Sequence, residues 1–177
     1  RPLTTRDGFF THAIFGFLTM LSRLLDEEKP EALCVAFDRR EPTFRHLEYE
    51  GYKATRHAMP EELAMQMPVL KEVLDAMNIP RYELAGFEAD DLIGTISRKC
   101  EKEGWDCVIA TGDKDSLQLV TEHTTVKLIS SCMGQTTTKD MTPEAFFESY
   151  GFAPAHIVDL KALMGDASDN IPGVPGV

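Results

Sequence analysis

The sequence predicts an α/β fold in which a mostly parallel, twisted sheet carries helices on both faces. Segments with helical periodicity alternate with short apolar runs, and this alternation implies right-handed crossovers between parallel strands. Two of the runs, ALCVAF and WDCVIA, are continuously apolar or nearly so, which is typical of strands covered on both faces. The 177 residues, 43% of them hydrophobic, are enough for one domain with a substantial core.

The first half of the chain is predicted to hold three helices and two strands. Apolar residues at helical spacing predict a helix over Thr11–Lys29, and Ala32–Phe37 follows it as a buried strand. A second helix over Pro60–Met77 begins with a proline and two acids, which suit the first turn of a helix. A short strand at Arg81–Leu84 then leads to a third helix over Glu88–Glu103, which a glycine closes.

The second half is predicted to continue the alternation. Trp105–Ala110 and Thr124–Ser130 are expected to be strands, whereas the polar, threonine-rich stretch Ser131–Asp140 is expected to be a mobile loop. Thr142 caps one short helix, and another runs from Pro154 to about residue 164. The tail NIPGVPGV, with its Pro-Gly breaks, predicts the opening of a turn or hairpin.

Composition excludes several classes of protein. Eighteen Lys and Arg against 29 Asp and Glu give a net charge of −11, which argues against a protein held to nucleic acid or anionic lipid by its overall charge. No apolar run approaches the roughly 18 residues of a membrane span. The four cysteines form no Cys-x-x-Cys pair, which argues against zinc. Unpaired cysteines without a visible signal peptide predict a reducing cytoplasm.

Acidic residues follow three of the predicted strands directly. Functional groups in open α/β sheets collect beyond the carboxyl ends of the strands, so we expect these acids at one edge. They are Asp38 after the first strand, Glu88, Asp90 and Asp91 after the second, and Asp113 and Asp115 after the third. Two more, Asp166 and Asp169, lie in a later loop that reaches this edge only if the chain folds back. Taken singly, Asp91 or Asp115 is as well explained by a helix cap or a surface acid.

A cluster of this size needs counter-cations. Two carboxylates about 4 Å apart repel by roughly 4 kcal/mol at an effective dielectric constant of 20. Carboxylate oxygens favour Mg²⁺ or Mn²⁺ over zinc or copper, and DKDSLQLVTEHT lacks the glycine and glutamate of a calcium-binding EF-hand. There are more acids than one magnesium ion uses, which predicts two ions and hence hydrolysis of a phosphate ester.

Four segments resemble the 5′ nuclease domains of bacterial DNA polymerase I, which belong to the flap endonuclease family. They are VAFDRREPTFRHLEYEGYKATR, GFEADDLIGT, TGDKDSLQLV and DLKALMGDASDNIPGVPGV. The resemblance implies a PIN-like 5′ nuclease fold with an acidic two-metal site, a helical arch and a helix-hairpin-helix type element that grips duplex DNA. It also implies hydrolysis of DNA phosphodiesters at 5′ ends, nicks and 5′ flaps in replication and repair, with two Mg²⁺ or Mn²⁺ ions.

The resemblance implies a role for each acid. The positions that match metal-site carboxylates of the family are Asp38, Glu88, Asp90, Asp113 and Asp115. Further acids of the same pocket, some acting through water, are matched by Asp91, Asp166 and Asp169.

Basic and aromatic residues also match the family. The segment GYKATR resembles the base of the arch, where Lys53 and Arg56 would face the scissile phosphate and Tyr52 would stack on a terminal base. Without the resemblance, a solvated amphipathic helix with long basic side chains is the better explanation. Arg45 and His46 match the family too, and Arg45 is counted with the DNA-binding residues although neither has a firm role.

The resemblance also predicts truncation at both ends. The family begins with a strand that delivers another aspartate, and a basic residue follows on the next helix; both would precede PLTTRDG. The family also continues past GVPGV into DNA-gripping helices. We therefore expect residues 1–177 to be a single 5′ nuclease domain with little or no activity alone.

Two other interpretations stay open. A haloacid-dehalogenase-like Mg²⁺ phosphatase also places an Asp-x-Asp after a strand, as in TGDKDS, but it needs that pair at the first strand. A non-catalytic, metal-dependent module that binds DNA structures is the other alternative. The sequence also leaves open whether a polymerase follows on the same polypeptide, and the balance between exonucleolytic and flap-endonucleolytic cutting.

Overall fold

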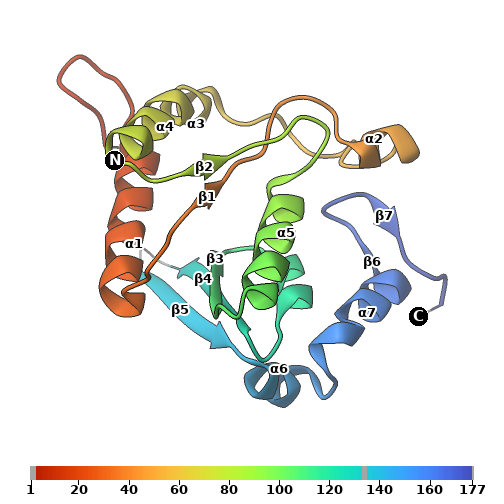
Figure 1. Cartoon of the computed structure of the whole chain (residues 1–177). Coiled ribbons are helices and arrows are strands. Elements are labelled where there is room, and N and C mark those ends of the chain that lie inside the picture. Colours follow the sequence, from red (N-terminus) through yellow and green to blue (C-terminus); the bar gives the residue numbers. More distant parts are fainter. Residues whose placement is uncertain (1–2, 133–134, 177) are drawn as a thin grey trace. The chain divides into compact units, whose positions relative to one another are not determined.

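The computed structural model describes residues 3–132 and 135–176, and the chain divides into two compact units (Figure 1). The first unit comprises Arg1–Phe37 and His57–Glu83, and the second comprises Asp38–Arg56 and Leu84–Val177. No described helix is long and apolar enough to cross a membrane.

The first unit is a small helical layer beside a pair of short strands. Its elements are α1 (His12–Glu28), β1 (Val35–Ala36), α3 (Glu61–Ala64), α4 (Gln66–Ala76) and β2 (Arg81–Tyr82). Helices α1 and α4 lie side by side and bury Leu21, Leu70 and Leu74 between them. Strand β1 pairs parallel with β2, and the predicted helix over Thr11–Lys29 is confirmed within a residue at each end.

The predicted helix over Pro60–Met77 forms as two helices, α3 and α4, that meet at Met65. Pro68 explains the interruption, because it has no N–H to donate to the carbonyl of Ala64. The buried amide of Gln66 ties this junction to α1: its Oε1 accepts from the backbone N–H of Ala13 at 2.9 Å. The first turn of α1 thereby gains a partner for a free N–H.

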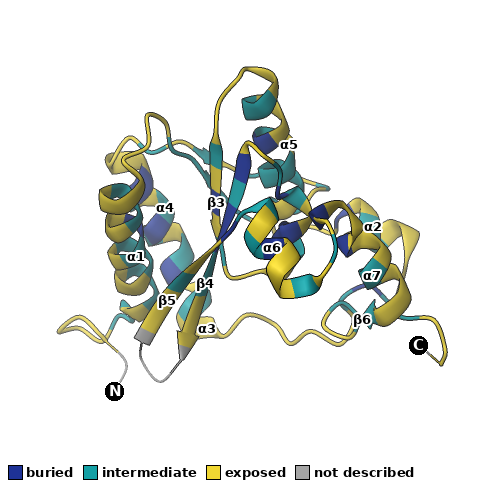
Figure 2. Ribbon diagram, turned by 90° about the horizontal axis from the view of Figure 1, so that it is seen from below, coloured by how far each residue is buried: buried dark blue, intermediate teal, exposed yellow. Residues whose placement is uncertain are grey.

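The second unit contains the larger core. Its elements are α2 (Phe44–Glu48), α5 (Ala89–Lys102), β3 (Cys107–Thr111), the 3₁₀ helix η1 (Lys114–Leu119), β4 (Thr124–Cys132), β5 (Gln135–Met141), α6 (Pro143–Tyr150), the 3₁₀ helix η2 (Pro154–His156), α7 (Ile157–Met164), β6 (Gly165–Asp166) and β7 (Ile171–Pro172). Leu117, Val126 and Phe146 are fully buried in this core. Figure 2 shows buried residues in β4, whereas α6 is mostly exposed or half-buried apart from Phe146.

The sheet of the second unit has the order β3-β4-β5. Strands β3 and β4 are parallel, as the predicted crossovers require, and β5 is antiparallel to β4. The prediction of a mobile loop over Ser131–Asp140 is therefore wrong for its described residues; residues 133 and 134 lie outside them. Hydroxyl side chains explain the strand, since Ser130 and Thr137 face each other across the ladder with their oxygens 3.1 Å apart.

The last helices form as predicted. The Thr142 hydroxyl accepts from the backbone N–H of Ala145 and caps α6. Pro143 is the first residue of this helix, as predicted. Pro154 opens η2, which continues into α7 up to Gly165. The tail pairs back as β7 against β6, so it closes a hairpin that begins at Gly165 and does not open one as predicted.

Candidate functional site

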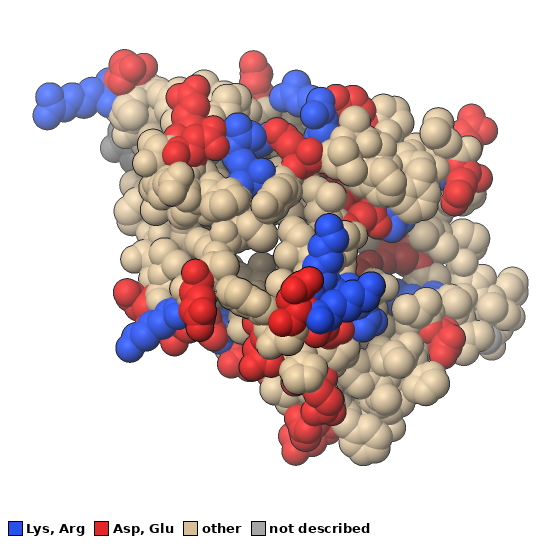
Figure 3. Space-filling view, viewed as in Figure 1, with Lys and Arg blue, Asp and Glu red and all other residues tan. Residues whose placement is uncertain are grey.

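A pocket of about 400 Å³ in the second unit gathers most of the predicted site residues. The acids that line it are Asp38, Glu88, Asp90, Asp113, Asp115, Asp166 and Asp169. The other predicted residues that line it are Arg45, Tyr52, Lys53 and Arg56. Asp91 lines a neighbouring pocket instead. On the face shown in Figure 3, acidic side chains are spread over the surface with basic side chains among them, in keeping with the net charge of −11.

The N-terminus of α5 places the first group of acids. Glu88 is the N-cap residue, and its backbone N–H donates to the Asp91 carboxylate at 2.9 Å, which closes a capping box. Asp38 reaches the same turn, where its Oδ1 accepts from the N–H of Ala89 at 2.7 Å. Free N–H groups and the helix dipole both stabilise carboxylates at this end.

The turn after β3 places the second group. The Asp113 carboxylate accepts from the backbone N–H of Asp115 at 2.9 Å and so caps η1. The acid at 113 thus has a local structural reason to be there, in addition to any chemistry.

The acid loop, residues 165–173, carries the third group. The Asp166 carboxylate accepts from the backbone N–H of Ser168 at 2.8 Å, and Asp169 accepts from the Lys53 backbone N–H through its carbonyl at 2.9 Å. A Cβ added at Gly165 would lie 2.3 Å from the nitrogen of Gly173, so the two ends of the loop touch backbone to backbone. The predicted folding back of this loop toward the other acids is what the structure shows.

The segment GYKATR forms consecutive turns and is not the amphipathic helix that its residues alone favour. Lys53 has a left-handed backbone, with φ +55°, and its Nζ lies 2.7 Å from Glu88 Oε1. The Arg56 guanidinium lies 2.6 Å from Asp169 Oδ1. The basic side chains therefore face the acids across the pocket.

Tyr52 is buried, with 6% of its surface exposed. Its hydroxyl donates to Glu88 Oε2 at 3.0 Å, and its ring meets His46 edge to face with centroids 5.1 Å apart. In this structure Tyr52 therefore orients Glu88 and its ring is not available for the predicted stacking on a base. Burial, with the adjacent Glu88 carboxylate, raises the pKa of Tyr52 strongly, so the phenol keeps its proton.

Arg45 and His46 take structural positions. Arg45 binds Asp91 through two parallel hydrogen bonds of 2.8 Å, which hold the pKa of Asp91 below its ordinary value. His46 Nδ1 accepts from the backbone N–H of Thr43 and helps to begin α2. Arg45 thus holds the N-terminal turn of α5 through Asp91.

Lys161 is a site residue that sequence reasoning missed. Its Nζ lies 2.5 Å from Asp115 Oδ1 and 2.6 Å from Asp166 Oδ2, so it bridges two groups of acids. Burial opposes its charge, but the two carboxylates outweigh burial and raise the pKa of Lys161, and Lys161 in turn lowers that of Asp166. The available signal was its place in DLKALMGD, on the last turns of a helix that leads into the acid loop.

Negative charge is most concentrated at Asp90. Partial desolvation, followed by repulsion from Asp113, Asp38 and Glu88, raises the pKa of Asp90 to about 6. Within the described part of the chain, no three His, Cys, Asp or Glu side chains stand close enough together to hold one metal ion. Lys53, Arg56 and Lys161 neutralise the surrounding acids in this arrangement.

Asp90→Asn should stabilise the metal-free protein at pH 8. The folded state favours the protonated form of Asp90. The stability that Asp90 contributes is therefore fully present below pH 3.8 and is lost as the pH rises through about 6. Because the carboxylate is partly solvated, we expect a gain on the order of 1 kcal/mol, which is about 2 to 4 °C in Tm. Melting curves in EDTA at pH 8 and pH 4 check this: the gain should nearly vanish at pH 4, and equal gains at both values would contradict it.

The site combines acids at the strand ends of an α/β fold with lysine and arginine side chains. This combination defines the class of proteins that bind phosphate esters and act on them. The chain belongs to the family described as 5′-3′ exonuclease, N-terminal resolvase-like domain, which matches residues 1–151. The predicted membership in the 5′ nuclease family is thereby confirmed.

Relatives and solved structures agree with this. The chain is 48% identical over 177 residues to DNA polymerase I of Bacillus subtilis (strain 168), covering 99% of this chain and 20% of that protein. It is 47% identical over 173 residues to DNA polymerase I of Mycobacterium leprae (strain TN), covering 98% and 19%. It therefore spans about a fifth of the length of the curated relatives it matches.

The fold is also that of known structures. The T5 D15 protein co-crystallised with metal ions superposes with a TM-score of 0.75 at 22% identity, covering 93% of this chain and 64% of that one. The bacteriophage T5 D15 flap endonuclease, in a pseudo-enzyme-product complex with DNA and metal ions, gives a TM-score of 0.73 at 21% identity, covering 93% and 62%. The predicted 5′ nuclease fold is confirmed.

Proposed function

We propose that this chain is the nuclease domain of a bacterial DNA polymerase I and hydrolyses DNA phosphodiesters at 5′ ends, nicks and 5′ flaps, with Mg²⁺ or Mn²⁺ as cofactor. The observation that carries the proposal is the pocket of the second unit, where Lys53, Arg56 and Lys161 face acids from three segments of the chain. Family membership supports a nuclease over the phosphatase alternative. We place it in the bacterial cytoplasm, acting on nucleoid DNA in replication and repair.

The donor set fits two divalent cations in its chemistry. All the candidate ligands are hard oxygen donors. Asp90 is close enough to Asp113, Asp38 and Glu88 to be repelled by them, and Asp115 and Asp166 share Lys161. Asp169 pairs with Arg56, and Asp91 would act through Arg45 or water. The raised pKa of Asp90 marks an excess of negative charge that cations would relieve. When bound, two ions would clamp the attacking and leaving oxygens of the displacement.

The protein's own residues supply binding and charge. In the free protein, Lys53 is paired with Glu88 and Arg56 with Asp169. Both basic side chains therefore lie beside acids that would hold the cations, within reach of a phosphate bound at the same place. The planar guanidinium of Arg56 can donate parallel hydrogen bonds to two phosphate oxygens, and the ammonium of Lys53 adds a positive charge beside it. Tyr52 holds Glu88 in place through its hydroxyl.

The test is cleavage of a labelled 5′-flap DNA by the intact protein that carries this domain. We expect cutting near the flap junction with Mg²⁺ or Mn²⁺ and none with EDTA. Metal-dependent binding without cleavage would favour the non-catalytic module. Hydrolysis of a small chromogenic phosphate ester, with flap DNA left uncut, would favour the phosphatase.

Mg²⁺ or Mn²⁺ should stabilise the folded chain. Ions that bind only the folded state raise stability by about 2.7 kcal/mol at 100 times their Kd, equivalent to several degrees in Tm. Thermal melts with increasing MgCl₂, against NaCl at matched ionic strength, measure the effect. Zinc should not substitute specifically, and a Tm that responds equally to both salts would count against a specific metal site.

A further inference from the structure

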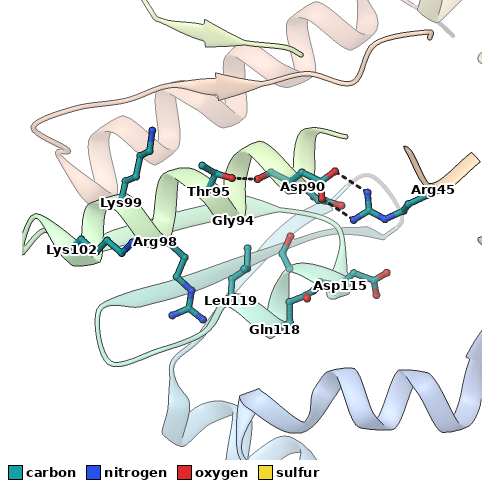
Figure 4. A pocket seen from close by; sticks show the side chains of 12 residues that line it. Arg45, Asp90, Gly94, Thr95, Arg98, Lys99, Lys102, Asp115, Gln118 and Leu119 are labelled. Carbon is teal, nitrogen blue, oxygen red and sulfur yellow. Dashed lines mark hydrogen bonds and ion pairs between the residues drawn. The ribbon is translucent and has the colours of Figure 1, made fainter. Parts of the chain in front are cut away.

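A second pocket, of about 490 Å³, lies between α5 and η1 in the second unit (Figure 4). It shares part of its lining with the pocket of about 400 Å³ described above, which we call the acid pocket; the shared residues are Arg45, Asp90, Asp115 and Gln118. Gly94 permits α5 and η1 to approach closely, because a Cβ there would lie 3.3 Å from a methyl group of Leu119. We call this pocket the α5 groove.

The two ends of the α5 groove differ in charge. Asp90 and Asp115, which also line the acid pocket, lie toward one end of the groove, and Arg98, Lys99 and Lys102 lie toward the other (Figure 4). The Lys99 side chain points to the side of α5 away from Leu119. Arg98 is paired with Glu101, with the guanidinium largely exposed. Lys99 and Lys102 are exposed and have no ion-pair partner among the described residues. Lys99 and Lys102 lie in the last turn of α5, where the helix dipole favours positive charge. The dipole does not account for the groove beside them.

The floor of the α5 groove contains an unsatisfied hydroxyl. Ser116 is only 2% exposed, and its Oγ is the buried side-chain atom that finds no hydrogen-bond partner among the described residues. Buried polar atoms nearly always have a partner, so this hydroxyl is a hydrogen-bonding group that a water or a ligand in the groove could satisfy. Gln118 and Thr95 add further polar groups to the lining.

We propose that the α5 groove binds the phosphodiester backbone of the DNA strand as that strand leaves the acid pocket. Phosphate oxygens would be met by Lys102, Arg98 and the flexible side chain of Lys99, with the Ser116 hydroxyl in the floor of the groove. Along a helix, Asp91 and Lys102 are separated by about 16 Å, close to the rise of five nucleotides at roughly 3.4 Å each. The inference rests on the proposed function, because it gives the same substrate a second point of attachment.

The experiment compares the parental protein with Lys99→Ala/Lys102→Ala by fluorescence anisotropy. A labelled 5′-flap DNA is titrated at several NaCl concentrations with Ca²⁺ in place of Mg²⁺. Each lost phosphate contact lowers the slope of log K against log[salt] by about 0.7 for single strands and 0.9 for duplex. We therefore expect the slope to fall by about 1.4 to 1.8, with affinity at low salt reduced about tenfold or more. The matched control, Arg6→Ala/Lys139→Ala, removes two exposed basic side chains outside the groove and should keep the parental slope.

Ser116→Ala gives a second readout that does not depend on net charge. Loss of an unsatisfied hydroxyl should leave the Tm of the DNA-free protein unchanged or higher, while DNA affinity falls about threefold. An unchanged salt slope in the double variant, or a slope lowered equally in the control, would overturn the proposal.

Titrations with inorganic phosphate and a mononucleotide separate a strand from a free phosphate. Binding of either at DNA-like affinity, lost in the double variant while DNA affinity is kept, would assign the groove to a small product and overturn the strand proposal. Cleavage of flap DNA by the parental protein is measured in parallel. If cleavage is normal and the slopes do not change, the groove inference fails and the proposed function stands.

Discussion

Arg56→Ala should slow flap cleavage by about 10²- to 10³-fold under single-turnover conditions, and Lys53→Ala should do the same. A positive charge aimed at a reacting phosphate stabilises the transition state more than the bound substrate, so cleavage should fall more than DNA binding. Arg56 is half exposed and its pair with Asp169 is near the surface, so its loss should change stability by only about 0 to 1 kcal/mol. A reduced cleavage rate of Arg56→Ala would therefore reflect the chemical step and not a loss of folded protein.

Lys53→Ala needs a stricter control. Its partner Glu88 is mostly buried, so the variant removes the nearer of its two cations, leaving Arg45 at 3.9 Å, and should also lower the Tm. Lys53→Arg keeps the charge and separates the two effects, and Arg23→Ala removes an exposed arginine with a similar ion pair from α1. Parental single-turnover rates for both alanine variants would refute the assignment of these side chains to the reacting phosphate.

Asp113→Asn should reduce cleavage by about 10³-fold while the fold is kept. Asparagine caps a helix about as well as aspartate, so the hydrogen bond from the Asp115 N–H to position 113 survives the change. The change removes the negative charge of Asp113 from the group of acids that also includes Asp38, Glu88 and Asp90. A divalent cation at a phosphoryl-transfer centre contributes several kcal/mol to the barrier, and each 1.36 kcal/mol is a factor of ten.

Two measurements test this prediction together. The Tm in EDTA should be unchanged or higher in Asp113→Asn, and the Tm increase on adding MgCl₂ should shrink. The matched control is Asp106→Asn, which removes a solvent-exposed aspartate that pairs with His123 on the same unit. Full activity of Asp113→Asn, with an undiminished response to Mg²⁺, would remove this residue from the proposed metal site.

Periodicity and caps predicted most of the elements because those signals are local. The α1 helix, the Thr142 cap and the start of α5 depend on residues within one or two turns of each other. Strand β5 was missed because its stability comes from pairing with β4, and its polar threonines give no hydrophobic alternation. The break between α3 and α4 could have been predicted from Pro68, because proline interrupts a helix even where the apolar residues keep helical spacing.

The acids of the site could be listed from the sequence, but their partners could not. Strand ends and the family resemblance pointed to Asp38, Asp90 and Asp113, and the structure gathers them in one pocket. That Lys161 bridges Asp115 and Asp166 depends on the path of α7, which no local pattern encodes. The burial of Tyr52 against Glu88 is likewise a result of tertiary packing.

The close approach of Gly165 and Gly173 also limits how this part of the protein can evolve. A side chain at either glycine would collide with main-chain atoms. Because a second substitution changes only a side chain, it could not make room there. A side chain at either position, or a change in the number of the seven residues between them, should therefore disrupt the loop. A substitution at the solvent-exposed Ala167 should be tolerated.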